Sequence, residues 1–139
     1  MTTPLDKLLH WYETLSPETL GGIAAFYGPD SRFRDPFNDV RGTDAIRRIF
    51  LHMFQNTEQP RFTIKDRMAQ GRQGFATWIF TFRLQGKEYV VEGSSHLFFD
   101  DDGLVTMHRD YWDAAEELFQ KLPVIGLPVK WLRKRFAAH

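Results

Sequence analysis

Hydrophobic residues recur with two different periods, and the change near residue 60 divides the chain into a helical part and a strand part. The first predicted helix begins at Thr3-Pro4, which supplies an N-cap and a first-turn proline, and its apolar face is formed by Leu5, Leu8, Leu9, Tyr12 and Leu15. A second predicted helix begins at Ser16-Pro17 and ends at Gly28-Pro29. A third begins at residues 42–44 and carries one apolar stripe, formed by Ile46, Ile49, Phe50, Met53 and Phe54.

Beyond residue 60 the hydrophobic positions alternate, which predicts four strands, over residues 61–70, 74–84, 88–99 and 104–112. Short segments rich in Gly or Asp separate these strands and predict hairpin turns, and therefore antiparallel pairing. An earlier alternating stretch, residues 31–37, predicts an edge strand or a bulge, because it contains Pro36. Helices followed by an antiparallel meander predict an α+β fold.

The remaining part of the chain predicts a helix from near Asp113 to before Pro123, and then a short amphipathic extension over residues 123–139. No linker or repeat interrupts the pattern. The length of 139 residues and a hydrophobic content of 42% fit one domain with a buried core, so we expect a single domain over residues 1–139.

Composition excludes several classes of function. The chain has 18 basic and 18 acidic residues, which argues against a general nucleic-acid surface. It contains no cysteine, and its histidines show no metal-ligand spacing, so we expect neither thiol chemistry nor a metal site. Its apolar runs are too short to span a membrane and it begins without a signal-like segment, so we expect a cytoplasmic protein. The 13 Phe and 4 Trp indicate wide apolar surfaces in a core or a pocket.

The order of these elements and several local strings resemble the nuclear transport factor 2-like superfamily. Residues 20–27, 34–37 and 42–46 resemble its opening helix, strand and helix, and residues 108–113 (HRDYWD) resemble the last strand of its SnoaL-like members. This superfamily includes ketosteroid isomerase, SnoaL-like polyketide cyclases and limonene-epoxide hydrolase. The resemblance implies a cone-shaped curved antiparallel sheet packed on the N-terminal helices, an apolar pocket inside it, no cofactor, and a homodimer formed through the outer sheet face.

Asp35 is the first candidate catalytic residue. It alternates with Phe33 and Phe37, which should point inward, and desolvation in such surroundings raises the pKa of a carboxyl group toward the range useful for proton transfer. The matching Asp-Pro position of ketosteroid isomerase holds the general base, which implies the same role here. Alternatively, Asp35 organises the turn at Pro36 by accepting backbone hydrogen bonds.

Asp110 and His108 are the other candidate catalytic residues. They alternate along the last predicted strand with Trp112, so the three side chains share one face. Two carboxylates and an imidazole are sufficient for general acid–base chemistry. Alternatively, His108 is a core histidine bonded to a neighbouring carboxylate, and Asp110 forms a salt bridge to Arg109 or another arginine.

The predicted ligand-binding residues are mostly aromatic. Trp11 and Ser95 match the positions of the oxyanion donors of ketosteroid isomerase, but they are weaker or differently placed donors, which argues against steroid isomerisation. Residues 78–82 lack the Arg and Asp that epoxide hydrolysis needs in that region. The full predicted lining is Trp11, Phe33, Phe37, Trp78, Phe80, Ser95 and Trp112.

Three functions remain open from the sequence. The first is a cofactor-free enzyme that acts on a small apolar or carbonyl-containing molecule, with Asp35 as the base and Asp110 with His108 as relay or donor. The second is a pocket that binds such a molecule without turnover. The third is an interaction module that works through the outer sheet face.

Overall fold

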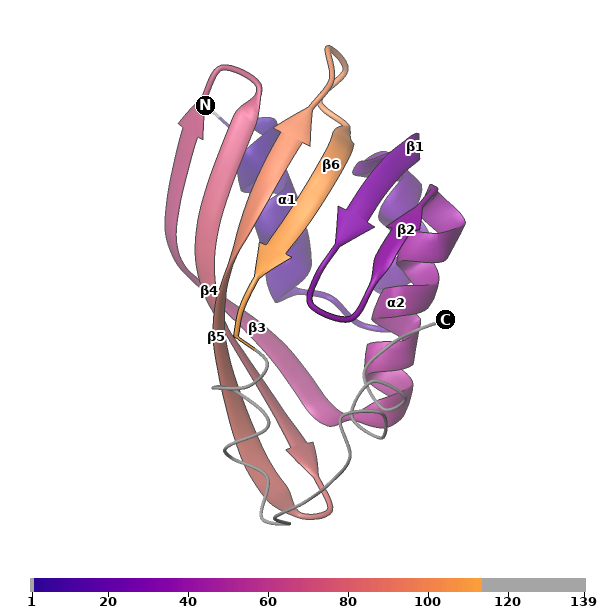
Figure 1. The fold of residues 1–139 in the computed structure, drawn as a ribbon, viewed down its shortest axis with the longest axis vertical. Coiled ribbons are helices and arrows are strands. Elements are labelled where there is room, and N and C mark those ends of the chain that lie inside the picture. The colour runs from indigo at the N-terminus through magenta and orange to yellow at the C-terminus, as the bar shows by residue number, and fades with distance from the viewer. Residues whose placement is uncertain (1, 114–139) are drawn as a thin grey trace.

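The computed structural model describes residues 2–113, and these residues form two helices, one 3-10 helix and a six-stranded sheet (Figure 1). The elements in chain order are α1 (Pro4–Glu13), the 3-10 helix η1 (Thr19–Ala25), β1 (Tyr27–Arg34), β2 (Asp39–Arg41), α2 (Thr43–Asn56), β3 (Glu58–Gln70), β4 (Gln73–Leu84), β5 (Lys87–Phe99) and β6 (Val105–Tyr111). The predicted α+β class is confirmed. The predicted helix that begins near Asp113 and the extension over 123–139 lie outside the described residues.

Helix α1 begins where the sequence predicts. The Thr3 hydroxyl accepts from the backbone N–H of Asp6, and the Asp6 carboxylate accepts from the backbone N–H of Thr3, so two donors of the first turn are satisfied. The apolar face of α1 is buried, and the helix packs mainly against β3. The N-terminal signals and the apolar spacing therefore agree with the observed packing.

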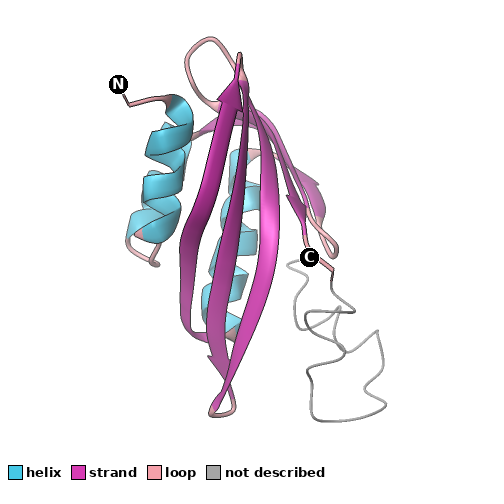
Figure 2. Ribbon diagram, turned by 90° about the vertical axis from the view of Figure 1, so that its left-hand side faces the viewer, coloured by secondary structure: helices cyan, strands magenta, loops and turns pink. Residues whose placement is uncertain are grey.

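The long strands β3, β4 and β5 form a curved antiparallel meander (Figure 2). The β4–β5 hairpin turns at Gln85 and Gly86, which both have positive φ angles (52° and 78°), as a tight turn between twisted strands requires. Strand β3 has two register shifts, one of them between Ile64 and Asp66. Such irregularities increase the local twist and bending of a strand.

Two elements differ from the prediction for residues 16–37. The predicted α-helix is the short 3-10 helix η1, and Gly21 and Gly22 in it have low α-helix propensity. Strand β1 begins at Tyr27, earlier than predicted, and ends before Asp35, so Asp35 lies in the turn between β1 and β2 rather than inside a strand.

The sheet order is β2-β1-β6-β5-β4-β3, and all neighbouring strands are antiparallel except β1 and β6. The predicted antiparallel sheet is therefore confirmed for the strands that hairpins join, and the parallel pair of β1 and β6 is the exception. A hairpin turn sets the direction of the strands it joins, whereas β1 and β6 are separated by most of the chain and meet only through the fold. Their parallel register places Phe33 beside His108 and Arg34 beside Arg109.

The buried apolar residues form two clusters. The larger cluster joins α1, η1 and α2 to the sheet and includes Leu9, Tyr27 and Ile46. The smaller cluster lies on β4, β5 and the β1–β2 turn, and it consists of Phe37, Trp78, Phe82, Leu84, Tyr89 and Val91. Residues of both clusters line the pocket described below.

Candidate functional site

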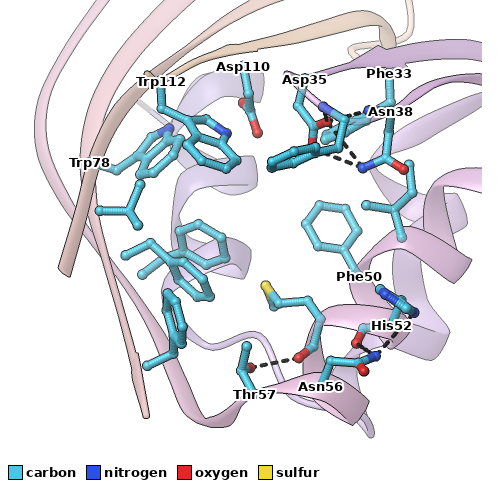
Figure 3. Close-up of a pocket in the computed structure, with 17 residues that line it drawn as sticks. Phe33, Asp35, Asn38, Phe50, His52, Asn56, Thr57, Trp78, Asp110 and Trp112 are labelled. Atoms are coloured by element: carbon cyan, nitrogen blue, oxygen red, sulfur yellow. Dashed lines mark hydrogen bonds between the residues drawn. The ribbon is translucent and has the colours of Figure 1, made fainter. Parts of the chain in front are cut away.

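A mostly aromatic pocket opens between α2, the β1–β2 turn and the curved strands (Figure 3). Its cavity volume is about 100 Å³, and the wider space around the cavity opens to solvent. Asp35 and Asp110 lie at one end of this pocket, and His52, Asn56 and Thr57 lie at the opposite end. The two carboxylates that the sequence singled out therefore face one space.

Asp35 both organises its turn and lines the pocket. Its Oδ1 accepts from the backbone N–H groups of Phe37 (2.8 Å) and Asn38 (2.7 Å), and from Nδ2 of Asn38 (3.1 Å). Among residues 2–113, its Oδ2 accepts only from the same Nδ2, at 3.3 Å. Asp35 thus combines the turn role and the pocket position that the sequence offered as alternatives, and Oδ2 is the less engaged oxygen.

The pKa of Asp35 is raised from 3.8 to about 6. Burial and the negative charge of Asp110 both raise it, while the hydrogen bonds from Phe37 and Asn38 oppose the rise. Burial is the largest of these causes. A carboxyl group with a pKa near 6 exchanges its proton readily at near-neutral pH, which is what general acid–base chemistry needs.

Asp110 is held from the side away from the pocket. Its Oδ1 accepts from the Ser95 hydroxyl at 2.5 Å and lies 2.6 Å from Nε2 of His108. The Ser95 oxygen in turn accepts from Nε1 of Trp78 at 2.9 Å. No hydrogen bond or ion pair to an arginine holds Asp110 within residues 2–113. The salt-bridge alternative for Asp110 is therefore not what the structure shows.

His108 lies behind Asp110 and does not line the pocket. Its side chain is 3% exposed, and its Nδ1 lies 2.7 Å from the Tyr27 hydroxyl and 3.1 Å from the Tyr12 hydroxyl. The two tyrosine hydroxyls also contact each other. His108 therefore takes the buried position, bonded to a carboxylate, that the sequence offered as its alternative, and it reaches the pocket only through Asp110.

Five of the seven predicted lining residues lie on the pocket: Phe33, Phe37, Trp78, Phe80 and Trp112. Trp11 does not, because it packs in the larger cluster, where its ring stacks on Phe26 and its Nε1 donates to the carbonyl of Thr19 at 3.1 Å. Ser95 does not line the pocket either, since its hydroxyl lies between Trp78 and Asp110. The structure therefore places Trp11 and Ser95 behind the lining of this pocket, not in the lining as the sequence predicted.

The polar end of the pocket was not predicted from the sequence. His52, Asn56 and Thr57 come from the last turns of α2 and its C-cap, where Thr57 donates to the Met53 carbonyl at 2.6 Å and Asn56 donates to the His52 carbonyl at 2.8 Å. The apolar stripe predicted for this helix contains Met53, which lines the pocket. If that stripe is placed against the pocket, the polar residues next to it on the helix also lie near the pocket.

Trp78 is seated on a glycine of the neighbouring strand. Gly93 is its partner across β4 and β5, and a Cβ atom built on Gly93 would collide with carbons of the indole ring. The absence of a side chain at residue 93 lets the ring lie flat against the strand. This contact places one wall of the pocket.

Two properties of the described part of the chain bear on the classes of function. Residues 2–113 contain no group of three or more His, Asp or Glu side chains placed to hold a metal ion. None of their helices is both long and apolar enough to cross a membrane.

Comparison with known proteins places this chain in a family. Residues 8–108 match the model of the SnoaL-like domain. The chain belongs to the SnoaL-like domain family. A search of the curated proteins found no match.

Solved structures show that this SnoaL-like protein has a nuclear transport factor 2-like fold. A protein with a ketosteroid isomerase-like fold from Catenulispora acidiphila, in complex with trimethylamine, has 18% identity and a TM-score of 0.74, covering 94% of this chain and 98% of its own. TerC, co-crystallised with polyporic acid, has 17% identity and a TM-score of 0.72, with coverages of 86% and 96%. An LEH-like epoxide hydrolase of M. tuberculosis has 18% identity and a TM-score of 0.68, with coverages of 84% and 84%. Identities this low establish the fold alone.

Proposed function

We propose that this SnoaL-like protein catalyses proton transfer, without a cofactor, on a small and largely apolar molecule that carries a carbonyl or another polarised group. The observation that carries the proposal is the presence of Asp35 and Asp110 at the same end of one aromatic pocket. Two neighbouring carboxylates do not ionise equally, so one of them holds a proton that the other lacks.

The surroundings of the two carboxylates support different roles. Asp35 has a pKa of about 6, so it is the group that carries the proton and serves as the acid. Asp110 accepts two short hydrogen bonds through Oδ1, which hold its carboxyl group in place at the end of the pocket, so we assign it the role of the base. This reverses the role that the resemblance to ketosteroid isomerase implied for Asp35, and the physical reason is its raised pKa, caused first by burial and then by the negative charge of Asp110.

The proposed chemical step is enolisation. The Asp110 carboxylate removes a proton from the carbon next to a carbonyl group, and the electron pair of the broken C–H bond forms the enolate. The Asp35 carboxyl group donates to the developing negative charge on the carbonyl oxygen. Return of a proton to the same or another carbon completes an isomerisation or an exchange with solvent.

Two observations argue against the reactions of the better-known relatives. The N–H of Trp11 is engaged with Thr19 and the hydroxyl of Ser95 with Asp110, so neither is an oxyanion donor in the pocket. The pocket wall on β4 is apolar, formed by Trp78, Phe80 and Phe82, and lacks the Arg and Asp of epoxide hydrolysis. Structures of TerC with polyporic acid and of another relative with trimethylamine support a small organic molecule as the ligand class.

The proposal is tested by proton exchange on a simple probe. The full chain is incubated in D₂O with 2-tetralone, a small aromatic ketone with acidic C–H bonds, and deuterium incorporation is followed by ¹H NMR. Asp110→Asn should lose the exchange, because the base is gone, while Asp102→Asn, at an exposed aspartate far from the pocket lining, should keep it. Full exchange by Asp110→Asn would refute the assignment of the base.

The second candidate function is binding without turnover, which the predominance of aromatic and aliphatic side chains in the pocket favours. Quenching of tryptophan fluorescence by 2-tetralone measures that binding, since Trp78 and Trp112 line the pocket. Binding by the unmodified protein with exchange no faster than in buffer would favour this candidate over catalysis.

The expected homodimer and the cytoplasmic location stay predictions. Light scattering of the purified protein tests the homodimer.

A further inference from the structure

Asp110 is the meeting point of two buried chains of hydrogen bonds. One chain begins at Trp78, whose indole N–H can only donate, and passes through the Ser95 hydroxyl to Oδ1 of Asp110. The other reaches the same Oδ1 through Nε2 of His108, whose Nδ1 faces Tyr27 and Tyr12. Both chains end on one oxygen, and within residues 2–113 no hydrogen bond to Oδ2 is formed.

The positions of the protons in the second chain follow from counting donors and acceptors. An ionised Asp110 can only accept, so Nε2 of His108 carries a proton and donates it. With neutral His108, the Tyr27 hydroxyl donates to Nδ1 and the Tyr12 hydroxyl donates to the Tyr27 oxygen, and every proton has an acceptor. If Nδ1 were also protonated, its proton and the hydroxyl protons of Tyr12 and Tyr27 would have only the two tyrosine oxygens to bind. One of these three protons would then lack an acceptor among the described residues.

Burial keeps the two tyrosines in their donor form. Loss of solvation raises the pKa of both Tyr12 and Tyr27 well above the usual value for tyrosine. Aromatic packing also limits rotation of the imidazole, since Phe33 meets the His108 ring edge to face at 4.6 Å between centroids and Tyr27 stacks near it at 6.0 Å. This packing therefore favours a single orientation of the His108 ring and one set of hydrogen bonds to it.

We propose that Tyr12 and Tyr27 are positioning residues for Asp110: their hydroxyls hold His108 as the tautomer that donates from Nε2, and this bond turns Oδ2 of Asp110 toward the pocket. Neither tyrosine lines the pocket, so neither would touch a ligand. This inference rests on the proposed function of Asp110 as the base. It adds two residues, from α1 and β1, to the machinery of that site.

The tautomer is measured directly, without any substrate. ¹⁵N–¹H correlation spectra of the imidazole rings should show that His108 is protonated at Nε2 and unprotonated at Nδ1. The variant His108→Asn assigns the signals, because the His108 signals are missing from its spectrum. In the double variant Tyr12→Phe/Tyr27→Phe, the Nδ1 signal should shift strongly because both donors are gone. Protonation of His108 at Nδ1 in the unmodified protein would overturn the proposal.

The single variants keep the test valid if the double variant does not fold. Tyr27 donates to Nδ1 at 2.7 Å, and Tyr12 acts behind it and lies 3.1 Å from Nδ1, where its hydroxyl can replace the lost donor. Tyr27→Phe should therefore shift the Nδ1 signal partially and Tyr12→Phe less. The matched control is Tyr89→Phe, which removes a hydroxyl from a buried tyrosine that stacks on Phe82 in the smaller cluster. The control should leave the His108 signals unchanged; a shift equal to that of Tyr27→Phe would contradict the inference.

The effect on the reaction is read from the 2-tetralone exchange. Removing both hydroxyls should lower kcat by about tenfold, the cost of about one hydrogen bond, and leave KM unchanged, because ligand contacts stay in place. An unchanged kcat together with a shifted Nδ1 signal would overturn the positioning role. If the unmodified protein shows no exchange at all, the proposed function fails, whereas the tautomer spectra still decide whether the tyrosines orient Asp110.

Discussion

Replacing Asp35 by Asn should make the protein more stable at high pH. In the folded state burial and Asp110 raise the pKa of Asp35 from 3.8 to about 6, so the ionised form is disfavoured. This rise corresponds to about 3 kcal/mol, at 1.36 kcal/mol for each pH unit. An Asn at residue 35 carries no charge, and its side-chain oxygen can still accept from the backbone N–H groups of Phe37 and Asn38.

The sign of the pH dependence follows from the direction of this pKa change. A group whose pKa is higher in the folded state than in the unfolded state stabilises the fold fully when the pH is below its unfolded-state pKa, which is 3.8 for Asp35. That contribution is lost as the pH rises through about 6. The difference in unfolding free energy between Asp35→Asn and the unmodified protein should therefore be near zero at pH 3.5 and reach about 3 kcal/mol in favour of the variant at pH 8.

The assay is urea unfolding followed by tryptophan fluorescence at several pH values from 3.5 to 8. Asp39→Asn is the matched control, because the Arg32 guanidinium lowers the pKa of this exposed carboxyl and the stability that it contributes is lost as the pH falls. The two variants should thus show slopes of opposite sign. A difference for Asp35→Asn that does not change with pH would refute the reasoning.

Two further substitutions test the packing behind the site. Gly93→Ala should displace the Trp78 indole, because the added methyl group would occupy the place of ring carbons, and lower the unfolding free energy by about 1–3 kcal/mol. A displaced ring should also weaken the quenching of fluorescence by 2-tetralone. Ser31→Ala should leave stability unchanged or raise it by up to about 1 kcal/mol, because the buried Oγ of Ser31 has no hydrogen-bond partner in the described part of the chain, residues 2–113. Urea unfolding measures both effects.

Each of these substitutions has a matched control. Gly21→Ala adds a methyl group where no atom lies within 4 Å, so a loss of stability equal to that of Gly93→Ala would contradict the explanation by collision. Ser95→Ala removes a buried hydroxyl that takes part in two hydrogen bonds, and it should cost about 1–3 kcal/mol. Equal effects of Ser31→Ala and Ser95→Ala would contradict the account of the buried hydroxyls.

The sequence predicted those parts of the fold that local physics determines. Thr3-Pro4 marked the start of α1, and the alternation beyond residue 60 predicted the four long strands within a few residues. The parallel pairing of β1 with β6 could not be predicted, because no turn joins these strands. The 3-10 helix was also missed, since the apolar spacing around it favoured an α-helix while Gly21 and Gly22 weakened it.

For the candidate site too, the sequence predicted the local relations between residues and missed the long-range contacts. The i and i+2 spacing of His108 and Asp110 predicted side chains on one face, and the structure brings them within 2.6 Å of each other. The contacts of His108 with Tyr12 and Tyr27 join residues about 80 to 100 positions apart. The sequence predicted Tyr12 and Tyr27 only as buried positions of helices, and nothing local indicates that their hydroxyls meet an imidazole.

A pH–rate profile tests whether Asp35 holds the proton and Asp110 removes one. The measurement is kcat/KM for deuterium exchange into 2-tetralone between pH 5 and 8, for the unmodified protein and for Asp35→Asn. The account predicts that kcat/KM of the unmodified protein falls as the pH rises through about 6 and that Asp35→Asn abolishes this inflection. A rate that rises through the same pH, or an inflection that survives in Asp35→Asn, would contradict it.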